Sequence, residues 1–229
     1  SVKLIDHEKN NLQLFYKAVI FNPSRMSVES NFLEFNSFKN PAQVILNWKK
    51  LHEKYNKSLD IFLALLTNPP KFLEYKFLFM AQTLESFHRM SDYKQKKLSK
   101  SELKKLKKFI RDSLNDSKFS PHTENVDQCL AHFDDVNLRE RIKDLISEIV
   151  NFLPNTFADE FIGKFITTRN EITHVVGTNQ ELTFRQDLYS LTRKAEGIAC
   201  LLIMNQLFEK EEFKDYANHR KIKYLINGG

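Results

Sequence analysis

From Asn40 to the end of the chain, apolar residues recur at intervals of three and four positions in one segment after another. Residues at this spacing lie on one face of an α-helix, so each segment predicts an amphipathic helix. Only five glycines and six prolines occur among the 229 residues, which leaves few positions that favour tight turns or end a helix. We therefore expect an all-α fold, a bundle of helices, rather than a turn-rich β fold.

The apolar pattern divides this region into a series of predicted helices. In chain order they cover about 41–55, 59–67, 71–91, 94–111, 138–153, 156–176, 183–208 and 209–224. The segment 71–91 is the most apolar, with apolar residues around much of its circumference, so we expect it at the centre of the bundle. Residues 112–121 contain Asp, Asn, Ser and Pro and predict a loop.

The first 38 residues follow a different pattern from the rest. Residues 12–21 alternate partly between apolar and polar and favour a β-strand, and residues 32–35 favour a second short strand. Two interpretations remain open: segment 1–38 is the tail of an upstream β-domain, or it is an extension that caps the helices. Because the chain starts at Ser1 rather than Met, we expect it to be part of a longer protein, with the helical domain at 39–229 and its core at 70–208.

The helix predicted at 156–176 carries three polar residues away from its apolar face, namely Arg169, Asn170 and His174. Asn170 and His174 are four positions apart, which places them about 40° apart around the helix axis. Arg169 has the longest side chain of the three, so a charged guanidinium, an amide and an imidazole can meet near the helix end that Gly177 predicts. Taken singly, the three residues also suit a surface ion pair, a buried hydrogen bond and a helix C-terminal cap.

The spacing Arg-Asn-x-x-x-His at 169–174 resembles the signature of HEPN domains. The layout of residues 77–88, residues 161–174 and the long helix after Thr183 is similar to the ApeA-like branch of this family, and the resemblance covers about 70–208. It implies a helical bundle that follows a β-rich domain and forms a homodimer with the motif at the seam. Family members are bacterial anti-phage effectors that cut RNA, often tRNA, and many HEPN ribonucleases need no metal, so we expect no cofactor.

The resemblance also implies a role for each residue of the motif. His174 would act on the ribose 2′-OH as a general base, or protonate the leaving 5′-oxygen, and the unperturbed pKa of histidine near 6.5 suits either role. Arg169 would hold the scissile phosphate and stabilise its added negative charge, while Asn170 would hydrogen-bond the phosphate or orient the imidazole. The product is then a 2′,3′-cyclic phosphate. One helix offers one histidine, so a second copy across a two-fold axis would supply the partner acid or base.

Two other functions stay open beside the endoribonuclease. A catalytically inactive HEPN module could bind RNA or a partner protein, and a helical interaction domain could assemble a larger defence complex. Some HEPN toxins are silenced by modification of a Tyr two residues after the His. Val176 holds that position here, so we do not expect this control.

Basic residues gather between Lys94 and Arg111, and the formal net charge of the chain is +6. Four lysines of this segment are candidate contacts for the RNA backbone: Lys104, Lys105, Lys107 and Lys108. The alternative is an amphipathic surface helix whose lysines are only solvated.

The remaining candidate residues carry weaker signals. Cys129 and Cys200 fit no disulfide framework, which indicates a reducing compartment, and no apolar run approaches a membrane span, so we expect a cytoplasmic protein. His122, Cys129 and His132 lie close in sequence, but zinc needs a fourth ligand, so we expect no metal site. Glu85 either forms a surface ion pair or faces Arg169.

Overall fold

In a computed structural model, the residues that can be described are 2–5, 11–14, 38–115, 117–131, 133–173 and 185–228. The chain divides into two compact units, Ser1–Phe38 and Lys39–Gly229. In the first unit, strand β1 (Val2–Ile5) pairs antiparallel with strand β2 (Asn11–Leu14), and Val2 lies opposite Leu14. β2 overlaps the start of the segment 12–21 that favours a strand, whereas the strand predicted at 32–35 lies outside the described residues.

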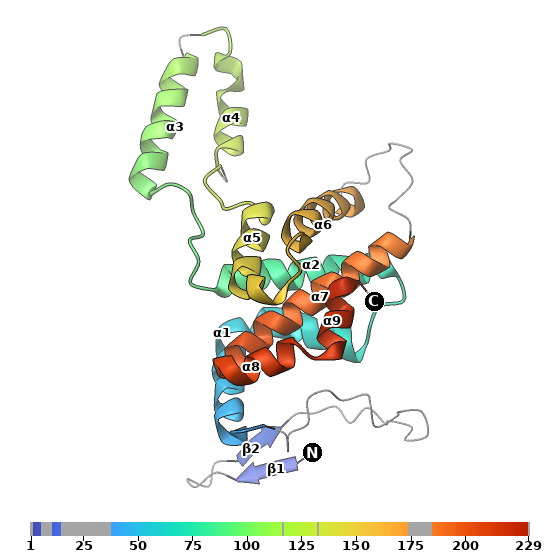
Figure 1. The fold of residues 1–229 in the computed structure, drawn as a ribbon. Helices are drawn as coiled ribbons and strands as arrows, with labels where there is room; N and C mark the ends of the chain where they lie inside the picture. Colours follow the sequence, from blue (N-terminus) through green and yellow to red (C-terminus); the bar gives the residue numbers. More distant parts are fainter. Residues whose placement is uncertain are drawn as a thin grey trace. The chain divides into compact units, whose positions relative to one another are not determined.

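The second unit consists of helices joined by loops, and within the described residues its only β contact is a single bridge between Lys96 and Asp135 (Figure 1). Its α-helices are α1 (Pro41–Thr67), α2 (Leu73–Met90), α3 (Lys100–Asn115), α4 (Thr123–Cys129), α5 (Leu138–Ile149), α6 (Phe157–Thr173), α7 (Arg185–Leu207), α8 (Lys210–Ala217) and α9 (Arg220–Asn227). Two 3₁₀ turns, η4 (Ser120–His122) and η5 (Val150–Phe152), precede α4 and follow α5. The all-α prediction is therefore confirmed. None of these helices combines the length and the apolarity that a membrane crossing requires.

The core of the bundle forms around α7, which packs against α1, α2, α5, α6, α8 and α9. Its Ile198, Leu201 and Leu202 are fully buried, and so are Phe77 and Met80 of α2, which confirms that the segment 71–91 is central. At Gly197, a side-chain Cβ would come within 2.8 Å of the Ile226 side chain, so the small residue allows α7 and α9 to approach closely.

Several helix boundaries follow from local capping signals. Asn40 caps α1 by accepting from the Gln43 amide at 3.1 Å, with Pro41 in the first turn, where its missing N–H has no partner to lose. At the start of α5, Asn137 and Glu140 form a reciprocal capping box. These signals lie within three residues of one another, so they act wherever the helix is placed in the fold.

Four details of the helix prediction were wrong. They do not include the pair of helices expected at 41–55 and 59–67, because α1 consists of two helices that meet at a kink at Tyr55 (φ −118°, ψ 26°), where the Tyr55 ring stacks on Phe87. The helix expected at 209–224 is divided into α8 and α9, since the His219 side chain accepts from the Lys221 amide and caps α9. The loop expected at 112–121 is shorter, because α3 continues to Asn115, and the sequence analysis missed α4.

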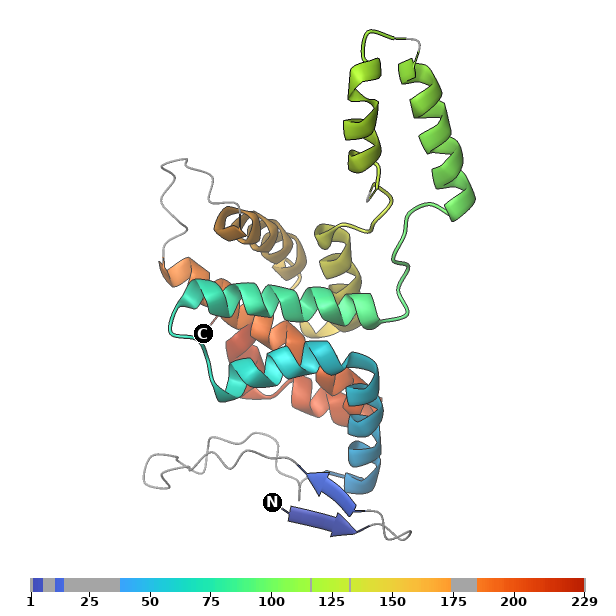
Figure 2. The same cartoon turned by 180° about the vertical axis from the view of Figure 1, so that it is seen from behind.

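The fourth difference concerns the start of the basic helix. α3 begins at Lys100, not at 94, because the preceding residues bond to the segment before α5. The Lys97 amide donates to the Asp134 carbonyl at 2.6 Å, and the Lys96 ammonium pairs with Asp134 and Asp135. α3 and α4 then pack on each other and stand apart from the other helices in both views (Figures 1 and 2). We call this pair the α3–α4 hairpin.

Candidate functional site

The motif helix α6 is held in place by a row of buried aromatic rings. Phe157 and Phe161 have ring centroids 5.3 Å apart, and Phe161 and Phe165 have theirs 5.1 Å apart. Phe165 also meets Phe77 of α2 edge to face at 5.2 Å. Such ring pairs stabilise by about 0.5–1.5 kcal/mol each beyond the area that they bury. The apolar face of α6 is therefore fixed against α2, and its last turn has a defined direction.

Arg169 and Asn170 lie in this last turn and contact each other. Arg169 Nη1 donates to Asn170 Oδ1 at 3.4 Å, with Arg169 half-buried and Asn170 exposed. The Thr173 hydroxyl donates to the carbonyl oxygens of Arg169 at 2.8 Å and Asn170 at 3.2 Å, one turn earlier in the same helix. Asn170 is exposed, so the alternative that it forms a buried hydrogen bond is ruled out.

The guanidinium of Arg169 has no carboxylate partner among the residues that the structure describes, so the surface ion pair considered for it has no support there. Its remaining N–H groups donate to no residue that the structure describes, and their planar fork matches the oxygens of a phosphate. The third residue of the motif, His174, lies outside the described residues, as do Val176 and Gly177. The structure thus brings two of the three predicted catalytic residues together at an exposed helix end.

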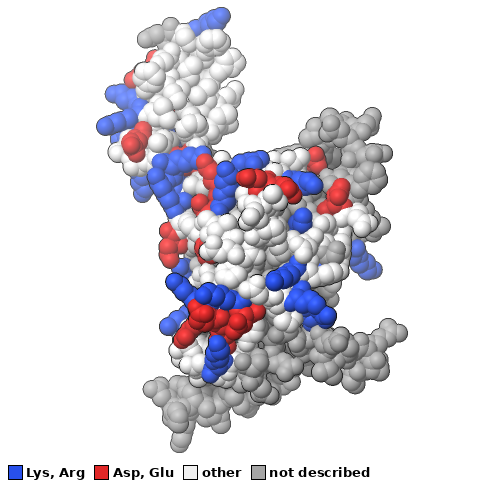
Figure 3. Space-filling view, viewed as in Figure 1, with Lys and Arg blue, Asp and Glu red and all other residues white. Residues whose placement is uncertain are grey.

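The four candidate RNA-binding lysines lie on α3. Lys104, Lys105 and Lys108 are exposed and Lys107 is half-buried. None of them forms an ion pair within the described ranges, and Figure 3 shows basic side chains along the α3 edge of the α3–α4 hairpin. No contact that the structure describes joins these lysines to Arg169, so they form a separate basic surface.

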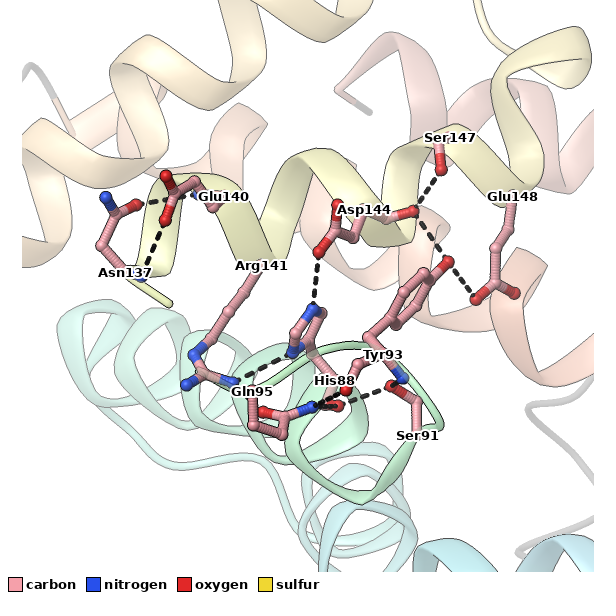
Figure 4. A network of polar contacts seen from close by, with 10 residues as sticks. All are labelled: His88, Ser91, Tyr93, Gln95, Asn137, Glu140, Arg141, Asp144, Ser147 and Glu148. Atoms are coloured by element: carbon pink, nitrogen blue, oxygen red, sulfur yellow. Dashed lines mark hydrogen bonds and ion pairs between the residues drawn. The ribbon is translucent and has the colours of Figure 1, made fainter. Parts of the chain in front are cut away.

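A buried polar network that the sequence analysis missed connects α2 with α5 (Figure 4). At its centre, His88 is fully buried, and its Nδ1 lies 3.0 Å from Nη1 of Arg141, which is 1% exposed. Since a guanidinium can only donate, Nδ1 accepts, and the imidazole is neutral with its proton on Nε2. That N–H donates to Asp144 Oδ2 at 2.9 Å. Arg141 also donates to Gln95 Oε1 at 2.5 Å, and burial lowers the pKa of its guanidinium.

The same network fixes the chain between α2 and α3. The Tyr93 ring stacks on His88 with centroids 4.9 Å apart, and its hydroxyl donates to Glu148 at 2.7 Å. Burial, followed by the Glu148 carboxylate, raises the pKa of Tyr93. Gln95 donates to the carbonyl oxygens of His88 and Tyr93. Because His88 is sealed from solvent, it orients neighbouring groups and cannot touch a substrate. In the sequence, His88 is marked only by being a polar residue in the most apolar of the predicted helices.

Two weaker candidates can also be placed. Glu85 forms an ion pair with Arg89 one turn later, at 2.8 Å, and no described contact joins it to Arg169. His122 and Cys129 are exposed, while His132 lies outside the described residues. Over the part of the chain that could be searched, no three His, Cys, Asp or Glu side chains gather where they could hold a metal ion.

Comparison with protein-family models gives one finding. The model described as Apea-like HEPN matches residues 78–213, more than half of the 229 residues. The match includes most of α2, the whole motif helix α6 and the central helix α7. The comparisons with curated proteins and with solved structures give no match.

Proposed function

The chain belongs to the Apea-like HEPN family, and from this premise we propose that it is a metal-independent endoribonuclease of bacterial anti-phage defence. HEPN domains are commonly ribonucleases. The observation that carries the proposal is the Arg169 guanidinium at the exposed end of α6, which contacts the Asn170 amide and has no carboxylate partner in the described part of the chain. A guanidinium with no carboxylate partner in the described ranges, beside an amide that can also donate, suits the binding of a phosphodiester.

The reaction then follows from the chemistry of the motif. His174 removes the proton of a ribose 2′-OH, and the 2′-oxygen attacks the adjacent phosphorus. The bond from phosphorus to the 5′-oxygen breaks, and this oxygen takes up a proton, which leaves a 2′,3′-cyclic phosphate and a 5′-hydroxyl. Arg169 balances the negative charge that develops on the phosphoryl oxygens, and Asn170 donates to one of them. A second copy of the chain supplies the histidine that protonates the leaving oxygen.

The lysines of α3 would hold the RNA at a distance from the cut. Lys104, Lys105 and Lys108 are exposed and unpaired within the described ranges, so each can neutralise one phosphate. Replacing all three with Ala should weaken binding of a single-stranded RNA and reduce the slope of log K against log salt by about 2, because each contact contributes about 0.7. An unchanged slope would assign these lysines to a solvated surface.

The test of the proposal is cleavage of a tRNA pool in EDTA, with product ends mapped. Wild type is compared with His174→Ala, Arg169→Ala and Arg169→Lys. Matched controls are His122→Ala and Arg139→Ala, which change exposed residues of the same types on η4 and α5. We expect cyclic phosphate ends from the wild type and from both controls. We expect no product from His174→Ala or Arg169→Ala, and a reduced kcat for Arg169→Lys, which keeps the charge but loses the planar fork.

Two results would contradict the proposal. Cleavage that survives His174→Ala would remove the assignment of this site. Absence of cleavage by the wild type, together with RNA binding that Arg169→Ala abolishes, would favour the inactive RNA-binding module instead.

A further inference from the structure

A groove of about 350 Å³ lies between α6 and α7. Its lining residues are Gly163, Lys164, Thr167 and Thr168 from α6 and Asp187, Ser190, Leu191 and Lys194 from α7. Leu191 and Thr168 are buried and form the floor, while Lys164 and Thr167 are exposed at the rim. The volume is at the lower end of the range of small-ligand sites, about 300–1,000 Å³.

The charges of the groove suit an anion. Lys164 and Lys194 stand on different helices, and neither forms an ion pair with any carboxylate that the structure describes. The Lys194 ammonium lies 5.9 Å from the centre of the Phe157 ring, which keeps it beside the groove. The one acidic residue of the lining is the exposed Asp187. Two ammonium groups and the hydroxyls of Thr167 and Ser190 in the lining offer donors to successive phosphates of a polynucleotide.

Gly163 is the second observation, because the fold does not require it. A glycine inside a helix lowers stability relative to alanine. At Gly197 close packing against Ile226 explains the glycine, but a Cβ at Gly163 would meet no atom within 4 Å. The missing side chain therefore leaves open space above α6, at the edge of the groove.

This open position lies at the end of the groove away from the candidate active site, because Thr167 and Thr168 of the lining stand between Gly163 and Asn170 along α6. Gly163 and Asn170 are seven residues apart, so they lie about 20° apart around α6 and about 10 Å apart along it. Arg169 lies farther round the same helix, and its guanidinium reaches back to Asn170. A strand that enters the groove over Gly163 and runs past Thr167 thus meets Asn170 and then Arg169.

We propose that the α6–α7 groove is a subsite for single-stranded RNA that binds the phosphates beside the scissile one, with the strand entering over Gly163 and running past Thr167 to Asn170. This subsite rests on the proposed nuclease function for its substrate class. It deepens that function by assigning Lys164 and Lys194 to the backbone of the flanking nucleotides and Gly163 to the point where the strand enters the groove. An RNA strand fits better than a second protein chain, because the rim of the groove is charged and hydroxylated rather than apolar.

The test measures binding separately from cleavage. In a His174→Ala background, which removes the proposed cleavage, the affinity for a fluorescent single-stranded oligoribonucleotide is measured by anisotropy over a range of salt concentrations. Lys164→Glu with Lys194→Glu should weaken binding and reduce the slope of log K against log salt by about 1.4, the sum of two contacts. The matched control is Lys49→Glu with Lys50→Glu, a pair of exposed lysines on α1.

Gly163→Leu gives the second, independent readout. We expect the melting temperature to rise by about 2–4 °C, because leucine favours the helix and meets no neighbour, while RNA affinity falls several-fold. A loss of affinity with a gain of stability cannot come from misfolding. The subsite would be overturned if Gly163→Leu bound RNA as tightly as the His174→Ala background. It would also be overturned if the double variant at Lys164 and Lys194 bound as tightly as the control at Lys49 and Lys50. A change of oligomeric state with RNA binding intact would also overturn it, since the groove would then hold a second copy. If the wild type binds through the groove but cuts nothing, the nuclease proposal fails and the subsite stands.

Discussion

Replacing His88 with leucine tests the buried network most directly. The imidazole is fully buried and joins two helices, since it accepts from Arg141 at 3.0 Å and donates to Asp144 at 2.9 Å. Leucine fills a similar volume but offers no polar atom. Arg141, which is 1% exposed, would then keep only Gln95 as a side-chain acceptor in the described network.

The size of the effect follows from what each partner loses. A buried charged donor left without its acceptor costs about 1–3 kcal/mol, and the hydrogen bond to the 42% exposed Asp144 side chain adds about 0.5–1.5 kcal/mol. We therefore expect His88→Leu to lower the free energy of unfolding by about 2–4 kcal/mol. His88→Asn should recover about half of this, because its amide oxygen can take the place of Nδ1.

A double-mutant cycle with Arg141→Met separates this network from simple packing. With both polar partners replaced by apolar groups, no buried donor or acceptor is stranded between them, so the double variant should be more stable than the sum of the single losses by about 1–3 kcal/mol. Urea denaturation followed by far-UV circular dichroism measures each value, with the exposed His122→Leu as the control, expected within about 0.5 kcal/mol of wild type. Additive losses, or a His88→Leu protein as stable as the control, would refute the reasoning.

Three further predictions concern other parts of the bundle. Gly197→Ala should lower the free energy of unfolding by about 1–3 kcal/mol, since its Cβ would lie 2.8 Å from Ile226, and calorimetry would show a lower melting temperature. The pKa of Tyr93 is raised in the folded protein, so its neutral phenol favours the fold at pH values below about 10, where the unfolded phenol titrates. This contribution is lost as the pH rises above about 10. Urea midpoints should therefore fall more steeply between about pH 9 and pH 11 in wild type than in Tyr93→Phe. A thiol reagent followed by mass spectrometry should modify the exposed Cys129 quickly and the half-buried Cys200 much more slowly, because desolvation raises the pKa of Cys200 to about 12; equal rates would contradict this.

Features of the fold that depend on residues close together in the sequence could be predicted, whereas contacts between distant residues could not. The three- and four-residue spacing of apolar side chains predicted α2, α6 and α7 to within a few residues, and capping signals predicted the start of α1. The same spacing predicted the break at Tyr55, but not the stacking of Tyr55 on Phe87, 32 positions later, that accompanies it. The helix α4 was missed because the short segment before it resembles a loop and its packing partner is α3.

The candidate site shows the same division. Arg169 and Asn170 were found from the sequence because neighbours on one helix turn keep their spacing in any fold, and their contact at 3.4 Å agrees with it. The catalytic roles of Arg169, Asn170 and His174 stay predictions.

The sequence alone therefore determined that the chain is helical, which helix carries the motif and which family the motif resembles, because these depend on residues a few positions apart. Only the tertiary structure decided that His88 meets Arg141, 53 positions away, and that Lys164 and Lys194 line one groove. Such pairs form when helices distant in sequence pack together, and no local pattern specifies which of their side chains will meet.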